Sequence, residues 1–237
     1  LLSALRPDRR NAEAAVKYLL FGAATSGVFL WGMSLVAGLS GSFSLTEIAA
    51  KAPALIGEPA FTLGLVFASF AFLFKLSGFP AHFWAPDVYE SAATPVTNFI
   101  ATASKAAAVA VLIRVFQLMG VSPGLVTILS FLAFISMTLG NCVALVQKDV
   151  KRLLAYSSIA QAGYLLIGVI CLNGRGLSAA MFYSAVYVVM NLAAFFVITL
   201  MSHRGENVSL SQFRGRPLGL ILLFESTCNN DSHGFLL

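Results

Sequence analysis

Hydrophobic residues in this sequence gather into six long blocks, and short polar stretches separate the blocks. Four blocks contain no charged side chain, and each of the other two contains a single lysine. The blocks cover residues 18–46, 59–86, 91–113, 115–147, 153–174 and 176–202. About 20 apolar residues in a helix cross a hydrocarbon core of about 30 Å. Because a bilayer requires every backbone group to be paired internally, the pattern predicts an all-α, polytopic transmembrane helix bundle with six spans.

The second block contains residues that interrupt a helix. Pro80 has no N–H to donate to the carbonyl of Leu76, Gly78 loosens the same turn, and Pro86 follows shortly after. We therefore expect this span to break near Gly78-Pro80. Non-helical backbone at membrane depth is tolerated where it packs in protein or lines a wet cavity, as in the ion sites of many transporters.

Composition and charge exclude several classes of protein. Hydrophobic residues make up 58% of the chain and charged residues only 11%, which excludes a soluble globular enzyme. The net charge of +5 comes with long uncharged windows, so we expect a lipid bilayer as the surroundings and no nucleic acid as a partner.

Lysine and arginine outside the membrane predict the orientation of the spans. If six spans alternate, nine basic residues lie on one side and three on the other, and the richer side is the cytoplasm. We expect both ends of the six-span set to be cytoplasmic. The richer side holds Arg6, Arg9, Arg10, Lys148, Lys151, Arg152, Arg204, Arg214 and Arg216, and the other side Lys51, Arg114 and Arg175.

Sequence motifs of common enzymes and metal sites are missing. Cys142, Cys171 and Cys228 are widely spaced and form no CxxC pair, so we expect neither a zinc site nor an iron–sulfur cluster. No GxGxxG, GxxxxGK[ST], HExxH or GxSxG occurs. Isolated ionisable groups within the apolar blocks are therefore the candidates for function.

A charge near the bilayer centre costs about 3 kcal/mol on insertion scales, so such a residue is a functional candidate by default. Lys105 lies about midway in its span, among small neighbours, and would need a reach of about 15 Å to snorkel to the interface. Lys75 lies nearer the end of its span, where snorkelling is easier. His82 is seven residues further, on the same face if the helix ran straight, and is either functional or a hydrogen-bonded packing residue.

Other polar residues recur at helical spacing. Glu13 and Lys17 have the favourable i, i+4 order for an ion pair, which is either an interfacial anchor or functional. Polar side chains form one stripe on the fifth span and another on the sixth, and they hold either a water chain or, more commonly, interhelical hydrogen bonds. The stripes contain Ser157, Gln161 and Tyr164, and Ser184, Tyr187 and Asn191.

Lysines in lipid suggest one kind of chemistry. Removal from water lowers the pKa of a lysine by several units, so that it exchanges protons near neutral pH. Two such lysines in neighbouring spans, with a histidine between them and an acid to pair with, form a proton relay. The residues alone support an ion or proton pathway without naming the machine.

Three segments carry a resemblance to a known family. They read NAEAAVKYLLFGAA (11–24), FKLSGFPAHFWAPDVYESAATPVTNFIATASKAA (74–107) and DVKRLLAYSSIAQAGYLLIG (149–168). They closely resemble subunit N of the proton-pumping NADH:quinone oxidoreductase, respiratory complex I. That subunit is related to mitochondrial subunit 2 and to the Mrp-type antiporter-like subunits. The resemblance implies a fourteen-helix fold of two inverted repeats, with a discontinuous seventh helix.

The resemblance also implies roles and partners. It assigns proton-relay roles to Lys75, Lys105, His82, Glu13 and Lys17, because these positions match the family's motif residues. It implies no redox cofactor in this chain; NADH, FMN, iron–sulfur clusters and quinone belong to the complex as a whole. The implied partners are the other membrane subunits of complex I, and the implied location is the bacterial inner membrane.

The resemblance divides the chain in two. Residues 1–216 are expected to be part of an antiporter-like proton-translocating domain, whose family glutamate lies upstream and whose twelfth-helix lysine lies beyond the C-terminus. Residues 217–237 begin a further span and then turn polar, as in a truncated or frameshifted reading frame or a natural short tail. Two other functions stay open: a stand-alone Mrp-type cation/proton antiporter, and a non-conducting fragment.

Overall fold

The protein is a bundle of long helices. The computed structural model describes residues 9–120, 122–171, 173–202 and 207–213. These residues form α1 (Arg9–Ser40), α2 (Leu45–Leu55), α3 (Pro59–Leu76), α4 (Trp84–Ser91), α5 (Thr94–Ala101), α6 (Ala103–Met119), α7 (Pro123–Ala144), α8 (Val150–Ile170), α9 (Gly174–Met201) and a 3-10 turn, η2 (Leu210–Phe213). Six segments are long and apolar enough to cross a membrane, with α5 and α6 counted together. This confirms the all-α fold and the six spans, whereas the predicted tail at 217–237 lies outside the described residues.

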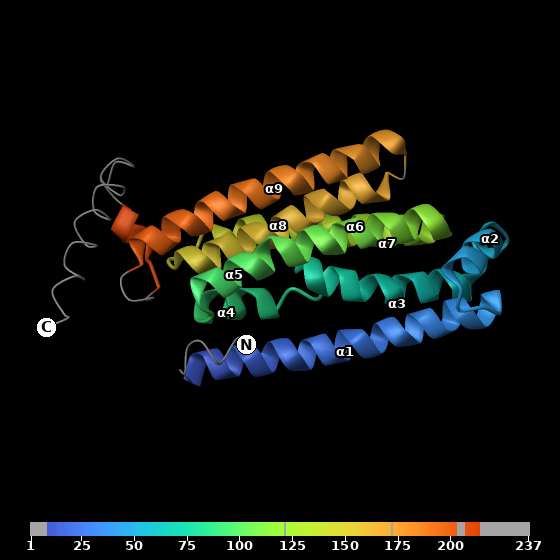
Figure 1. Ribbon diagram of the computed structural model, residues 1–237, viewed down its shortest axis with the longest axis horizontal. Helices are drawn as coiled ribbons and strands as arrows, with labels where there is room; N and C mark the ends of the chain where they lie inside the picture. Colours follow the sequence, from blue (N-terminus) through green and yellow to red (C-terminus); the bar gives the residue numbers. More distant parts are fainter. Residues whose placement is uncertain (1–8, 121, 172, 203–206, 214–237) are drawn as a thin grey trace, which may run out of the picture.

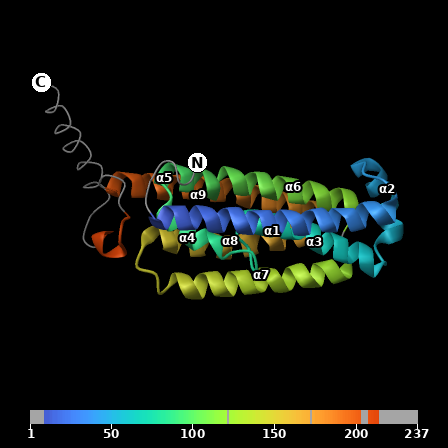
Figure 2. The same ribbon diagram turned by 90° about the horizontal axis from the view of Figure 1, so that it is seen from below.

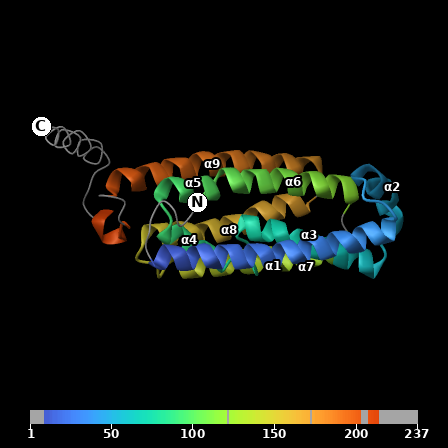
Figure 3. The same cartoon turned by 60° about the horizontal axis from the view of Figure 1, so that its bottom comes forward.

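The spans run side by side along the long axis of the molecule (Figure 1). Figure 2 shows α7 on one side and α5, α6 and α9 on the other, with α3, α4 and α8 between them. The view in Figure 3 shows the same order. α2 packs beside α1 at the opposite end of the bundle from α4 and α5. The short helix α4 is therefore held among longer ones near one end of the bundle.

Glycines allow two pairs of helices to approach closely. A Cβ at Gly32 of α1 would lie 2.6 Å from the backbone oxygen of Gly64 in α3. A Cβ at Gly140 of α7 would lie 2.6 Å from the backbone nitrogen of Ala160 in α8. Only a residue without a side chain fits such contacts, which replace the hydrophobic effect as the source of helix association in lipid.

The predicted break in the second block is confirmed between α3 and α4. Ser77 ends α3 in the left-handed conformation with φ 61°, and the N–H of Gly78 donates to the Leu73 carbonyl over 2.8 Å. The N–H of Phe79, which precedes a cis-proline, donates to Ser136 Oγ of α7 over 2.8 Å. The irregular segment is thus supplied with partners from protein, as membrane depth requires.

The third block forms one span, as predicted, but it contains a discontinuity that was not predicted. It divides into α5 and α6 at Thr102, whose φ is −110° and ψ −76°. The Thr102 hydroxyl donates to the carbonyl of Asn98 over 2.6 Å. The Thr102 N–H donates to the same carbonyl over 3.0 Å, so the hydrogen-bonded turn that precedes Thr102 is kept.

One of the basic residues counted outside the membrane is covered by protein. Lys151 is 0% exposed in the first turn of α8, whereas its place on the cytoplasmic side stays a prediction. The packing of α8 against α4 covers it, because α4 ends beside this turn. Four other members of the count, Arg6, Arg204, Arg214 and Arg216, lie outside the described residues.

Candidate functional site

Lys105 is a buried cation, 1% exposed near the start of α6. Its amine donates to the hydroxyl of Ser158 in α8 and, over 3.3 Å, to the Ser158 carbonyl. The amine also lies 5.9 Å from the centre of the Tyr187 ring in α9. The predicted burial of Lys105 within protein is therefore confirmed, and its partners come from other helices.

Ser158 joins Lys105 to two tyrosines. The Tyr187 hydroxyl donates to Ser158 Oγ over 3.0 Å, and the Tyr89 hydroxyl of α4 lies 3.3 Å from the same oxygen. All four side chains are buried. We call Lys105, Ser158, Tyr89 and Tyr187 the Lys105 cluster. It brings one polar side chain from each of four helices, α4, α6, α8 and α9, to a single point.

Sequence reasoning found only part of the Lys105 cluster. It named Tyr187 and Lys105, but it chose Ser157 for the polar face of α8, whereas the neighbouring Ser158 carries the contacts. Hydrophobic residues are spread evenly around α8, so the spacing of its polar residues did not identify the buried face. Tyr89 lies in the quoted HFWAPDVYE motif, which is the signal that could have found it.

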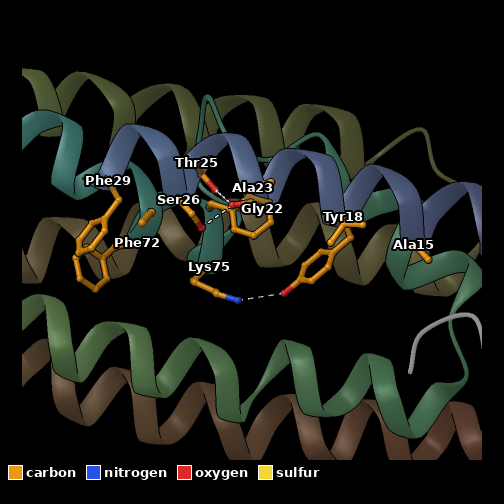
Figure 4. A pocket seen from close by; sticks show the side chains of 12 residues that line it. Ala15, Tyr18, Gly22, Ala23, Thr25, Ser26, Phe29, Phe72 and Lys75 are labelled. Carbon is orange, nitrogen blue, oxygen red and sulfur yellow. Dashed lines mark hydrogen bonds between the residues drawn. The ribbon is translucent and has the colours of Figure 1, made fainter. Parts of the chain in front are cut away.

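Lys75 has different surroundings. Its amine donates to the Tyr18 hydroxyl of α1 over 3.2 Å, and its side chain is exposed. It lines a cavity of about 600 Å³ with largely apolar walls from α1 and α3, including Phe29 and Phe72 (Figure 4). Lys75 is therefore a single cation at the edge of an open apolar hollow, outside the Lys105 cluster.

His82 lies in the irregular segment between α3 and α4. It is buried and packs on the rings of Phe79, at 5.7 Å between centroids, and Phe83, at 4.2 Å. Its Nδ1 has no hydrogen-bond partner among the described residues. Because the helix breaks at this point, the straight-helix face that His82 would share with Lys75 does not form.

Glu13 and Lys17 form the predicted ion pair, with 2.8 Å between Lys17 Nζ and Glu13 Oε1. The pair extends further than expected, because Lys17 also lies 2.8 Å from Asp87 of α4. Arg152 of α8 then contacts Asp87 over 3.4 Å and Glu90 over 2.7 Å. These five residues, which we call the ion-pair network, tie α1 and α8 to α4.

The ion-pair network is partly open to solvent, with its side chains 27% to 64% exposed. Each exposed pair adds little stability on its own, which suits the interfacial-anchor interpretation of Glu13 and Lys17. Asp87, Glu90 and Arg152 were missed. Their signal was present in part, since Asp87 and Glu90 lie three residues apart in the quoted motif and share a helix face.

The polar stripes bond between helices. Tyr183 of α9 donates to Gln161 of α8, and Asn141 of α7 donates to Tyr164 of α8 over 3.4 Å. Tyr187 adds its bond to Ser158. The interhelical hydrogen-bond interpretation is confirmed for these residues, whereas a water chain stays a prediction.

Comparison with known proteins places the chain in a family. The model of the NADH:quinone oxidoreductase/Mrp antiporter transmembrane family matches residues 1–215. The chain belongs to this family. A NADH-quinone oxidoreductase subunit N from Syntrophobacter fumaroxidans is 46% identical over 217 residues, which are 91% of this chain and 46% of that protein. The chain thus spans about half the length of the curated relatives it matches.

Solved structures of related complexes share the fold. A chain of respiratory complex I from Thermus thermophilus superposes with a TM-score of 0.77 at 38% identity, over 93% of this chain and 48% of that one. A chain of an archaeal membrane-bound sulfane sulfur reductase superposes with a TM-score of 0.81 at 26% identity, over 95% of this chain and 47% of that one. The helix bundle described above is therefore a multi-pass fold of respiratory membrane complexes.

Proposed function

We propose that this chain forms part of subunit N of a NADH:quinone oxidoreductase and conducts protons through its buried polar groups. Quinone reduction elsewhere in the complex would drive the transfer. The chain would lie in a bacterial inner membrane, with both ends of the six spans in the cytoplasm, beside other membrane subunits. NADH, FMN, iron–sulfur clusters and quinone would be bound outside this chain, which would carry no redox group.

The observation that carries the proposal is the Lys105 cluster. A buried ammonium group without partners is too costly to keep, and a neutral amine needs a donor for its lone pair. Lys105 has the Ser158 hydroxyl, which can serve in either role. The amine therefore has a hydrogen-bond partner in both of its protonation states, as a residue that takes up and releases protons requires.

Hydrogen-bond counting describes the two states. When Lys105 is protonated, Ser158 accepts from Lys105 and from Tyr187 and turns its own hydrogen to Tyr89. When Lys105 is neutral, the Ser158 hydroxyl donates to the amine and accepts from Tyr89 instead. Rotations of the Ser158 and Tyr89 hydroxyls therefore accompany each gain or loss of a proton, with no new contact between helices.

The other candidate relay residues would act around this cluster. Lys75, at the cavity between α1 and α3, would be the second amine of the pathway. His82 has a free Nδ1 at the helix break and would exchange protons there. Glu13 and Lys17 would set the charge at the membrane surface beside α4 through the ion-pair network.

The test is proton pumping by the assembled complex. In inverted membrane vesicles, Lys105→Ala should remove most NADH-driven acidification, because the central amine is lost. Lys148→Ala, which removes an exposed lysine, is the matched control and should pump normally. Normal pumping by the Lys105 variant would refute the relay role.

The family also includes Mrp antiporters, so a stand-alone cation/proton antiporter is the second candidate. That function would exchange sodium or potassium for protons in vesicles without NADH or quinone. Pumping that requires NADH and quinone favours the first proposal, exchange without them favours the second, and neither activity indicates a non-conducting fragment.

A further inference from the structure

A second lysine is as fully buried as Lys105 and has no part in the relay described above. Lys151 is 0% exposed, although it lies in the polar segment KDVKR that separates two spans. Its amine donates to the carbonyl of Ala92 over 3.1 Å. A buried lysine amine in a protein needs such acceptors to remain charged.

The acceptor of Lys151 is the end of a helix. Ala92 is the C-cap of α4, and it is itself 0% exposed. The last carbonyls of a helix lack partners within the helix and carry a partial negative charge. The cation of Lys151 is therefore placed where it satisfies one of these carbonyls and interacts favourably with the helix dipole.

α8 holds the last turn of α4 at two points. Lys151 and Ser158 are seven residues apart, so they lie on the same face of α8, about 10 Å from one another. Lys151 binds the Ala92 carbonyl, and Ser158 contacts the hydroxyl of Tyr89, which is three residues earlier in α4. The two contacts thus join α8 to the segment of α4 that carries Tyr89.

A neighbouring charge in the first turn of α8 also holds α4. Arg152 contacts Asp87 and Glu90 of α4. Asp149 caps α8 by accepting from the N–H of Arg152 over 3.0 Å. Burial raises the pKa of Asp149, and the hydrogen bond that it accepts from the N–H of Arg152 opposes that rise.

We infer that Lys151 is a positioning residue: its charged amine caps α4 and thereby holds Tyr89 against Ser158 in the Lys105 cluster. The effect on pumping rests on the proposed function, whereas the effect on α4 does not. In this role the Lys151 amine stays charged and does not transfer its proton.

The experiment measures α4 and pumping separately in the assembled complex. In Lys151→Gln, hydrogen exchange of residues 84–92 should accelerate at least about tenfold, because a hydrogen bond from a charged donor is lost. NADH-driven pumping should fall severalfold. Lys151→Arg, which keeps the charge but cannot release a proton, should restore both. Lys148→Gln removes an exposed charge from the same segment and should change neither.

A second measurement asks whether Lys151 acts through Tyr89. In a Tyr89→Phe background, Lys151→Gln should reduce pumping little further, because the contact that it positions is already lost. Unchanged exchange of α4 in Lys151→Gln would overturn the inference, as would full additivity with Tyr89→Phe. Failure of Lys151→Arg to pump despite normal α4 exchange would also overturn it, since lysine would then be needed as a proton carrier. If Lys105→Ala pumps normally, the proposed function fails, and the exchange of α4 still decides the role of Lys151.

Discussion

Replacing Ser158 by alanine removes the oxygen on which the Lys105 cluster converges. The change deletes one atom, so the packing of α8 against its neighbours is almost preserved. Lys105, Tyr187 and Tyr89 each lose their contact to this oxygen. We expect the variant to assemble and to pump protons poorly.

The magnitude follows from the contacts that are lost. A hydrogen bond to a charged group is worth about 1.5 to 3 kcal/mol, and 1.4 kcal/mol is a factor of ten in an equilibrium constant. Deleting the hydroxyl leaves the protonated amine with only the Ser158 carbonyl among its described acceptors. Protonation of Lys105 should therefore become less favourable by a factor of about ten to a hundred, with pumping reduced at least tenfold when this step limits the rate.

The assay is acidification of inverted membrane vesicles, normalised to the rate of NADH oxidation. Ser157→Ala is the matched control, because it removes a hydroxyl one residue away on a different face of α8. It should leave the normalised rate within about twofold of the unmodified complex, a shift of less than 0.5 kcal/mol as for most substitutions outside a buried network. Equal rates for the two variants would refute the assignment of Ser158 to the proton pathway.

Two further predictions concern packing and surface charge. Gly140→Ala should lower the stability of the protein in detergent by about 1 to 3 kcal/mol, because the added Cβ would overlap the backbone of α8. Gly27→Ala should be neutral or slightly stabilising, because a Cβ there meets no neighbour within 4 Å. Thermal unfolding of both variants tests this prediction, and equal midpoints would contradict it. Asp87→Asn should lower the free energy of unfolding by less than about 1 kcal/mol in 0.15 M salt, because the ion-pair network is partly exposed, and the difference from the unmodified protein should shrink at 1 M salt. A large loss of stability that does not depend on salt would show that the network is more strongly desolvated than its exposure indicates.

The fold could be predicted well because its main signals are local. An apolar stretch is long enough to span a bilayer whatever surrounds it, and Gly78 and Pro80 interrupt a helix through their own backbones. The discontinuity at Thr102 was missed. A threonine hydroxyl bonds either to the preceding turn or elsewhere, and the residue type alone does not decide between them.

The candidate site could be predicted only in part, because its contacts join distant segments. Lys17 and Asp87 are 70 residues apart in the chain, and Lys105 and Ser158 are 53 apart. The choice between Ser157 and Ser158 required knowing which face of α8 meets α4, α6 and α9. Hydrophobic residues are spread evenly around α8, so their pattern does not identify that face.

Local composition therefore decides that the described residues contain six segments able to span a membrane, where one of these spans breaks, and that Lys105 lies within a span. These properties depend on the free energy of placing each residue in lipid, and the total for a span is the sum over its residues. The packing of the helices decides that Lys151 is buried, that Lys75 opens on a cavity, and that one serine oxygen joins four helices. Those outcomes depend on partners from other helices, and only the assembled bundle brings them within hydrogen-bonding distance.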